Sequence, residues 1–442
     1  MGIMILEVTF AFHSFTLKGE KMKIISGNKQ AWLLCGILAI AGPVHAAGYV
    51  QTNLVASTDA YGASIVDPTL INAWGIAIRP AGLGGHFWVE SNGAGTSNQF
   101  IGDVGGTPLY SDKLRLVSIP GPGTGGSAAS IGTPTGVVFN PGNQFTITQG
   151  SITGPAKFLF ATDTGTISAW TERQNPDGSY DRQTYANLMV DRSAAGDQYF
   201  GIAISPANDR IYVANFGQNA GILSFNSSFT SVGSPSSFAS PFAAPGAARP
   251  GDYAPFNIQA LTGADGTSLF VAYAKTQADP DNLNQILGGE EVHGTGFGRL
   301  AQFDTSGGLI QTWDDRGMLN APWGMAYAPA DFGTYSGDLL VGNFGDGTIV
   351  AFDPTTHTAI DYLRDAQGHI LSIDGLWGLQ FGNGASLGTA DALYFAAGPH
   401  DETQGLFGSL VAAPVPEPES WAMFMAGLAF LAAMARRRAG RA

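Results

Sequence analysis

Cysteine is nearly absent from this 442-residue sequence, in which Cys35 is the only thiol. Cys35 falls inside a stretch with the features of a signal peptide, so we expect the processed protein to have no thiol. Such a chain forms neither disulfide bonds nor Cys-ligated metal sites, and its stability after export must come from packing. The five histidines expected in the processed chain also lack the paired spacing of metal ligands.

Basic residues are scarce as well. Between Ala47 and Pro414 the chain has 13 Lys and Arg against 31 Asp and Glu, a net charge of −18. A protein this acidic is repelled by nucleic acid and by anionic lipid surfaces, so we expect neither as a partner. The charge is compatible with cations and neutral sugars as ligands.

Glycine is abundant, with 61 residues, and much of it falls in an internal repeat. The clearest copy is Trp323–Pro354, which contains three short strand patterns and an Asn-Phe-Gly-Asp-Gly turn. Six copies begin at Trp74, Thr135, Phe200, Phe256, Trp323 and Trp377, at spacings of 61, 65, 56, 67 and 54 residues. This period suits one four-stranded blade with its loops and predicts an all-β, six-bladed β-propeller over residues 47–412.

The two ends of the repeat region complement each other. Residues 49–55 form a strand pattern without a neighbouring partner, whereas the sixth copy ends after residues 406–411 without a fourth strand. We therefore predict that the N-terminal strand completes the last blade and closes the ring, since an open ring would expose two unpaired edges. A disordered N-terminus is the alternative.

Residues 1–46 are expected to be an N-terminal extension and a secretory signal peptide. Met22 is the preferred start, because Lys23 and Lys29 precede an apolar run over residues 31–42 and small residues follow at 44–47. The alternative is an N-terminal membrane anchor, but the apolar run is short for a span.

The C-terminus, residues 413–442, has three parts. Pro416, Glu417 and Pro418 form a stiff spacer, residues 421–435 are apolar, and Arg436, Arg437 and Arg438 form a basic end. This tail resembles the PEP-CTERM sorting signal. The resemblance implies a bacterial exported protein, with signal peptidase and an exosortase as processing partners and a short transmembrane helix as a transient inner-membrane anchor. The alternative is an ordinary tail anchor.

The repeats also resemble a known type. Residues 213–217 and 341–349 are similar to NHL-type propeller repeats, and the processed chain resembles an uncharacterised bacterial propeller family whose members often carry PEP-CTERM tails. The resemblance implies the fold and the cell envelope or extracellular space as the destination. It implies no activity.

Polar residues in turns at one end of the predicted blades are the candidate binding residues. In alternating strands, the loop entering each first strand and the turn after each second strand lie on one face. The candidates on that face are Asn72, Asn92, Asp163, Asn215, Asn343 and Asp374. Asn and Asp also cap tight turns and tolerate left-handed backbone, which gives each a structural explanation.

Residues 279–298 offer a second surface. They contain Asp279, Asp281, Glu290, Glu291 and His293 among glycines, so calcium is a possible ligand of this predicted loop. The cluster has no calcium-loop spacing, and a solvated acidic loop is the favoured interpretation.

The aromatic residues that begin five of the six copies allow two interpretations. Flat rings can bind sugar faces, but one ring per blade at the same position is typical of packing, with the next glycine allowing close approach. The leading functional hypothesis is an exported binding or matrix-associated propeller, with exopolysaccharide or an envelope component as partner. The alternative is a secreted, lactonase-like hydrolase or lyase that uses a divalent metal on the channel face.

Overall fold

The structure, a computed structural model, describes residues 48–123, 131–233, 237–243, 248–414 and 418–440. The chain divides into a unit of residues 1–43 and a unit of residues 44–442, and only the second contains described residues. The predicted signal peptide, Cys35, Pro416 and Glu417 lie outside the described residues.

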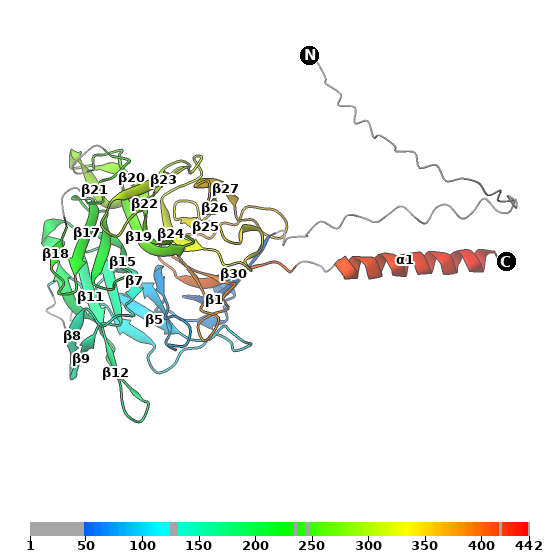
Figure 1. The fold of residues 1–442 in the computed structure, drawn as a ribbon, viewed down its shortest axis with the longest axis horizontal. Coiled ribbons are helices and arrows are strands. Elements are labelled where there is room, and N and C mark those ends of the chain that lie inside the picture. The colour runs from blue at the N-terminus through cyan, green and yellow to red at the C-terminus, as the bar shows by residue number, and fades with distance from the viewer. Residues whose placement is uncertain (1–47, 124–130, 234–236, 244–247, 415–417, 441–442) are drawn as a thin grey trace, which may run out of the picture. The chain divides into compact units, whose positions relative to one another are not determined.

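Six antiparallel sheets form the body of the protein (Figure 1). Their first strands contact one another in a closed ring. Blades 1 to 3 consist of β3 (Ala73–Ala77), β4 (Phe87–Ser91), β5 (Thr96–Phe100) and β6 (Leu116–Ser118); β7 (Pro134–Phe139), β10 (Phe158–Thr162), β11 (Thr166–Trp170) and β14 (Asn187–Asp191); and β15 (Tyr199–Ile204), β16 (Arg210–Asn215), β17 (Gly221–Asn226) and β18 (Ser231–Val232). Blades 4 to 6 consist of β19 (Tyr253–Gly263), β20 (Gly266–Asp279), β22 (Gly298–Phe303) and β23 (Leu309–Trp313); β24 (Pro322–Tyr327), β25 (Leu339–Asn343), β26 (Ile349–Asp353) and β27 (Thr358–Tyr362); and β28 (Leu376–Phe381), β29 (Leu393–Ala397), β30 (Leu406–Ala412) and β1 (Tyr49–Ala56). The predicted six-bladed β-propeller is confirmed.

The N-terminal strand closes the ring as predicted. Strand β1 pairs antiparallel with β30 from Tyr49 opposite Ala412 to Ala56 opposite Leu406, with one register shift between Asn53 and Val55. In Figure 1 the blue β1 lies beside the orange-red β30 for this reason. A short strand, β2 (Ile65–Val66), adds to the outer edge of β1 in parallel.

The inner strands approach closely because glycine follows the first residue of most repeats. A Cβ atom on Gly378 would lie 2.4 Å from the carbonyl oxygen of Trp74 in the next blade. In blade 4 the repeat has Asn257 instead of glycine. Its Nδ2 donates to the carbonyl oxygen of Trp323 in blade 5 at 2.7 Å. Its Oδ1 packs against Gly201 of blade 3, where an added Cβ would clash with that oxygen. The asparagine therefore bridges its two neighbouring blades.

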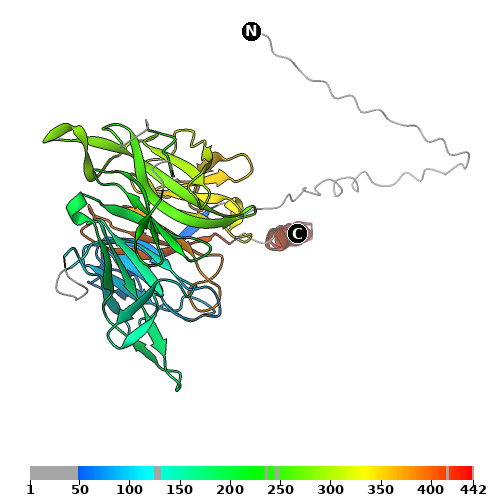
Figure 2. The same ribbon diagram turned by 60° about the vertical axis from the view of Figure 1, so that its left-hand side comes forward.

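Two blades carry additional hairpins. Blade 2 bears β8 (Thr146–Gln149) with β9 (Ile152–Pro155), and β12 (Glu172–Gln174) with β13 (Tyr180–Arg182), the latter projecting at the bottom of Figures 1 and 2. In blade 4, β20 continues past the sheet and pairs with β21 (Asn282–Val292). The predicted loop over residues 279–298 is thus largely a β-hairpin, because a long second strand gives the acidic segment a partner.

The C-terminal tail contains the helix α1 (Pro418–Ala439), which includes the predicted apolar segment of residues 421–435. Within the described part of the chain, no helix is long and apolar enough to cross a membrane.

Candidate functional site

Aromatic side chains fill the centre of the ring at the starts of the inner strands. Trp74, Phe200, Phe256, Trp323 and Trp377, each from a different blade, are buried in one cluster. The rings of Trp74 and Trp377 stack with centroids 3.8 Å apart, and Phe200 and Phe256 stack at 5.4 Å. The predicted packing role is confirmed. We call this cluster the aromatic plug.

An acid-lined cavity of about 520 Å³ lies against one side of the aromatic plug. Trp74, Phe200 and Trp377 contribute to its floor, and Phe344 stacks on Trp377 at 3.8 Å. The carboxylates that line it are Asp163, Glu290, Glu291, Asp401 and Glu402. Among the described residues around the cavity, none is a lysine or an arginine, and His293 is the one histidine.

Asp163 stands at the end of the second strand of blade 2, where the chain turns back. Its Oδ2 accepts a hydrogen bond from Nδ2 of Asn92 at 2.9 Å, and its Oδ1 accepts one from Oγ1 of Thr133. Burial raises the pKa of the Asp163 carboxyl, and these two hydrogen bonds oppose the shift. Blades 1 and 2 thus hold this carboxylate in a fixed position at the cavity wall.

Glu402 enters the cavity from an unusual turn between β29 and β30. His400, Asp401 and Glu402 have φ values of 57°, 49° and 62°, so three consecutive residues with side chains adopt the left-handed conformation, which costs energy at each of them. Burial, and then the charge of Glu291, raises the pKa of Glu402 to about 7, while a hydrogen bond with Asn72 opposes the shift. Glu402 therefore changes charge near neutral pH.

A strap from blade 4 covers part of the cavity. The β20–β21 ladder pairs Thr276 with Glu291 and Ala278 with Ile286, so residues 287–290 leave the ladder between these pairs. We call residues 287–293 the strap. Its Gly289 N–H donates to the carbonyl oxygen of Phe216 in blade 3 at 3.2 Å.

The strap supplies three ionisable groups to the cavity, Glu290, Glu291 and His293. Nε2 of His293 lies 2.6 Å from Oε1 of Glu291, and this hydrogen bond raises the pKa of His293. The channel face and residues 279–298 were separate candidate surfaces in the sequence. The fold brings parts of both to one cavity.

The predicted residues fall into two groups. Asn92 and Asp163 line the cavity, and Asn72 lies outside the lining but contacts Asn92. Oδ1 of Asn72 accepts from Nε1 of Trp377 at 3.0 Å, while its Nδ2 donates to Oδ1 of Asn92 at 3.5 Å. Asn72 therefore links the aromatic plug to the cavity wall.

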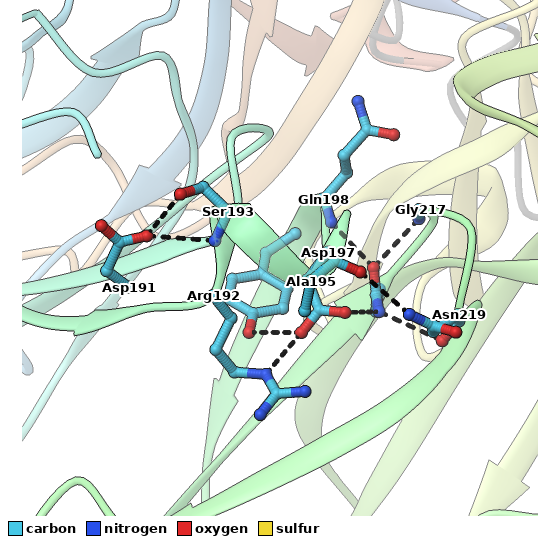
Figure 3. Close-up of polar contacts among 10 residues, drawn as sticks. Asp191, Arg192, Ser193, Ala195, Asp197, Gln198, Gly217 and Asn219 are labelled. Atoms are coloured by element: carbon cyan, nitrogen blue, oxygen red, sulfur yellow. Dashed lines mark hydrogen bonds and ion pairs between the residues drawn. The ribbon is translucent and has the colours of Figure 1, made fainter. Parts of the chain in front are cut away.

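Asn215 lies outside the cavity wall and fixes a turn. Its Oδ1 accepts from the backbone N–H groups of Gln198 and Gly217, at 2.8 and 3.0 Å, and its Nδ2 donates to Asp197 at 3.0 Å. Figure 3 shows Asp197 between this network and Arg192, whose Nε donates to it at 2.5 Å. The hydrogen-bonding atoms of Asn215 are engaged within the protein.

Asn343 and Asp374 also lie outside the cavity lining. Oδ1 of Asn343 accepts from the Asn320 N–H at 3.0 Å, and its Nδ2 donates to Thr348 at 2.9 Å. Asp374 is exposed, and its carboxylate accepts from the His400 N–H at 3.0 Å. As binding residues, Asn215, Asn343 and Asp374 stay predictions without a shared cavity.

Sequence reasoning missed Asp401 and Glu402 as cavity residues, because nothing in the repeat pattern indicates a left-handed turn of three non-glycine residues. For calcium, the described residues include no group of three or more His, Cys, Asp or Glu placed to hold a metal ion. The cavity is therefore described by its charge, aromatic floor and hydrogen-bonding groups.

The fold and the tail together define a six-bladed β-propeller with a sorting signal. Residues 414–438 match the PEP-CTERM protein-sorting motif, which confirms the predicted signal and marks the chain as an exported exosortase substrate. The match includes Pro416, Glu417, Pro418 and the three arginines.

The chain belongs to the family that includes the uncharacterized protein L690 of Acanthamoeba polyphaga mimivirus. The two are 30% identical over 374 residues, which cover 84% of this chain and 88% of L690. The uncharacterized protein R648 of the same virus is 29% identical over 381 residues, covering 85% and 84% of the two chains. Among solved structures, a glucose dehydrogenase aligns with a TM-score of 0.43 at 11% identity, over 83% of this chain and 100% of that one. The Kuenenia stuttgartiensis hydrazine synthase aligns with a TM-score of 0.40 at 14% identity, over 78% and 97%.

Proposed function

We propose that the exported propeller is a binding protein of the cell envelope or extracellular matrix, and that its acid-lined cavity takes a ligand bearing a protonated amine. The observation that carries this proposal is the set of five carboxylates around one cavity of about 520 Å³ without a lysine or arginine among the described residues that line it. Five acidic groups with one histidine leave an uncompensated negative charge, which attracts a cation.

The geometry supports an organic cation. Ammonium groups donate up to three hydrogen bonds, which suits carboxylates presented from several directions by blade 2, the strap and the turn of Glu402. The aromatic floor adds an apolar surface, on which Phe344 is only partly buried. A polysaccharide that contains amino sugars combines an ammonium group with an apolar ring face. We therefore propose such an exopolysaccharide as the partner, after an exosortase has removed the tail.

The test compares a trimer of glucosamine with its neutral N-acetylated counterpart by isothermal titration calorimetry. The double variant Asp163→Asn, Glu291→Gln should lower the affinity for the glucosamine trimer at least tenfold, because it removes two charges from the cavity wall. Asp391→Asn is the matched control, since Asp391 is acidic and exposed outside the cavity. Equal affinity of the wild-type protein for the two trimers would refute the proposal. So would a loss of affinity for the glucosamine trimer in the control variant alone.

A second candidate function is hydrolysis or lyase chemistry, and one observation favours it. The pKa of about 7 at Glu402 suits a general acid or base at neutral pH, and the carboxyl is held by a strained turn at the cavity. Screens on lactones and glycans, with and without added calcium, test this candidate. Turnover that is lost in Glu402→Gln and retained in Asp391→Asn would establish it. Absence of turnover on both substrate classes would leave the binding function alone.

A further inference from the structure

A second and larger cavity occupies the opposite part of the channel. It has a volume of about 810 Å³ and is bordered by the inner strands of all six blades. The starts of these strands meet in the aromatic plug, whereas this cavity is bordered by their later residues and the turns that follow, with Trp323 at its inner end. We call it the distal chamber. Its residues were not among the sequence candidates.

Two glutamine side chains in the distal chamber have their orientation fixed by backbone groups. Oε1 of Gln259 on β19 accepts from the Met325 N–H at 2.7 Å, so its amide NH2 is the end left for a ligand. Nε2 of Gln380 on β28 donates to the carbonyl oxygen of Phe381 at 3.0 Å, so Oε1 of Gln380 is the end left for a ligand. Within the described residues, no hydrogen bond reaches Nε2 of Gln259 or Oε1 of Gln380. The chamber thus offers one oriented donor and one oriented acceptor from different blades.

The distal chamber carries almost no net charge. Arg79 is the charged side chain among the described residues that line it, and its Nη2 forms an ion pair with Glu172 at 2.6 Å. The Arg79 guanidinium also lies over the rings of Phe139 and Phe158, at 5.5 and 5.6 Å from their centroids. The positive charge is therefore already compensated, and the rest of the wall is apolar or neutral.

We propose that the distal chamber is a separate binding site for a small neutral, hydroxyl-rich ligand such as a mono- or disaccharide. A hydroxyl group both donates and accepts, so a polyol satisfies the free NH2 of Gln259 and the free oxygen of Gln380 together. The apolar part of the wall, which includes Ile78 and Leu261, fits the CH face of a sugar ring. A volume of this size suits a ligand of one or two rings. This site rests on different residues from the acid-lined cavity.

The test uses four neutral probes, glucose, galactose, maltose and cellobiose, in calorimetric titrations of the full-length protein. Gln259→Glu is the informative variant, because the new carboxylate still accepts from the Met325 N–H while the ligand-facing donor becomes an anionic acceptor. We expect at least one probe to bind saturably and to lose affinity about tenfold or more in Gln259→Glu. Gln380→Leu, which removes the acceptor, should weaken the same probe. Gln367→Glu makes the same substitution at an exposed position and should leave affinity unchanged.

Three results would overturn the inference. The first is absence of saturable binding by all four probes. The second is binding that Gln259→Glu and Gln380→Leu leave unchanged while both variants melt at the wild-type temperature. The third is binding abolished by the double variant Asp163→Asn, Glu291→Gln, because the sugar would then occupy the acid-lined cavity. Retention of sugar binding in that double variant supports two independent sites.

Discussion

Replacing Glu402 with glutamine should stabilise the protein at alkaline pH and have much less effect at acidic pH. Glutamine keeps the size and hydrogen-bonding capacity of the side chain but never ionises. In the wild-type protein, burial and the nearby charge of Glu291 raise the pKa of Glu402 from its ordinary value of 4.5 to about 7. A raised carboxyl pKa means that the folded state prefers the proton. The destabilisation therefore grows as pH rises from about 4.5 to about 7 and is constant above that.

The size of the effect follows from the pKa shift. A shift from 4.5 to about 7 corresponds to roughly 3.5 kcal/mol at about 1.4 kcal/mol per pH unit. Glu402 is only partly buried at a cavity that opens to solvent, so screening reduces the expected gain to about 1–2 kcal/mol. The variant also removes the repulsion between Glu402 and the charges of Glu291, Glu290 and Asp163.

Urea unfolding at pH 5 and pH 8 measures this difference directly. The gain in unfolding free energy from Glu402→Gln should be about 1–2 kcal/mol larger at pH 8 than at pH 5. Asp391→Asn, at an exposed carboxylate outside the cavity, is the control and should show no comparable dependence on pH. An equal effect of Glu402→Gln at both pH values would refute the reasoning, because Glu402 would then have the same charge in the folded and unfolded chains.

Four further predictions concern the fold and the tail. Deleting residues 47–56 should lower the melting temperature by more than 10 °C, because blade 6 loses its outer strand; an unchanged value would contradict closure by β1. Gly378→Ala should lower the free energy of unfolding in urea by about 2–3 kcal/mol, since its Cβ would lie 2.4 Å from the Trp74 carbonyl oxygen. Gly427→Ala on α1, where nothing lies within 4 Å of the added Cβ, should cause no loss, because alanine favours a helix. Asn215→Ala should lower the free energy of unfolding by about 3 kcal/mol, because it removes one hydrogen-bond donor to Asp197 and the acceptor of two backbone N–H groups. A loss below about 0.5 kcal/mol would show that water replaces the amide. Intact-mass analysis from the native host should find a chain without residues 436–442, and a mass that includes them would refute processing of the tail.

The sequence predicts the architecture well because the propeller repeats its own constraints. An aromatic residue followed by glycine begins four of the six copies, and the spacing of the strand and turn patterns identifies the other two, which begin at Thr135 and Phe256. The asparagine at position 257, where most copies have glycine, has a physical reason, since its amide donates to the carbonyl oxygen of Trp323 in the next blade. Closure by β1 was also predictable, because an unpaired strand and an incomplete blade occur at opposite ends of the repeat region.

The candidate site was predictable only in part because its components do not repeat. Asn92 and Asp163 lie in the turns where the repeat pattern placed them. Glu290 reaches the same cavity because residues 287–290 leave the β20–β21 ladder. Glu402 reaches it because a left-handed turn directs it there. Both are local departures from regular geometry, which periodicity cannot indicate. Asn215 and Asn343 occupy the repeat position of Ser91 and bind their own turns, whereas Asn92 and Asp163 share the next position and face the cavity.

The most direct test of the proposed function is a crystal structure of the processed propeller with the glucosamine trimer at pH 7.5. The proposal predicts that an amine nitrogen of the trimer lies within hydrogen-bonding distance of Glu291, Glu402 or Asp163, above the ring of Phe344. It also predicts that the N-acetylated trimer leaves this cavity empty under the same conditions. A trimer bound elsewhere on the protein, or both trimers bound alike in the cavity, would contradict a site selective for a protonated amine.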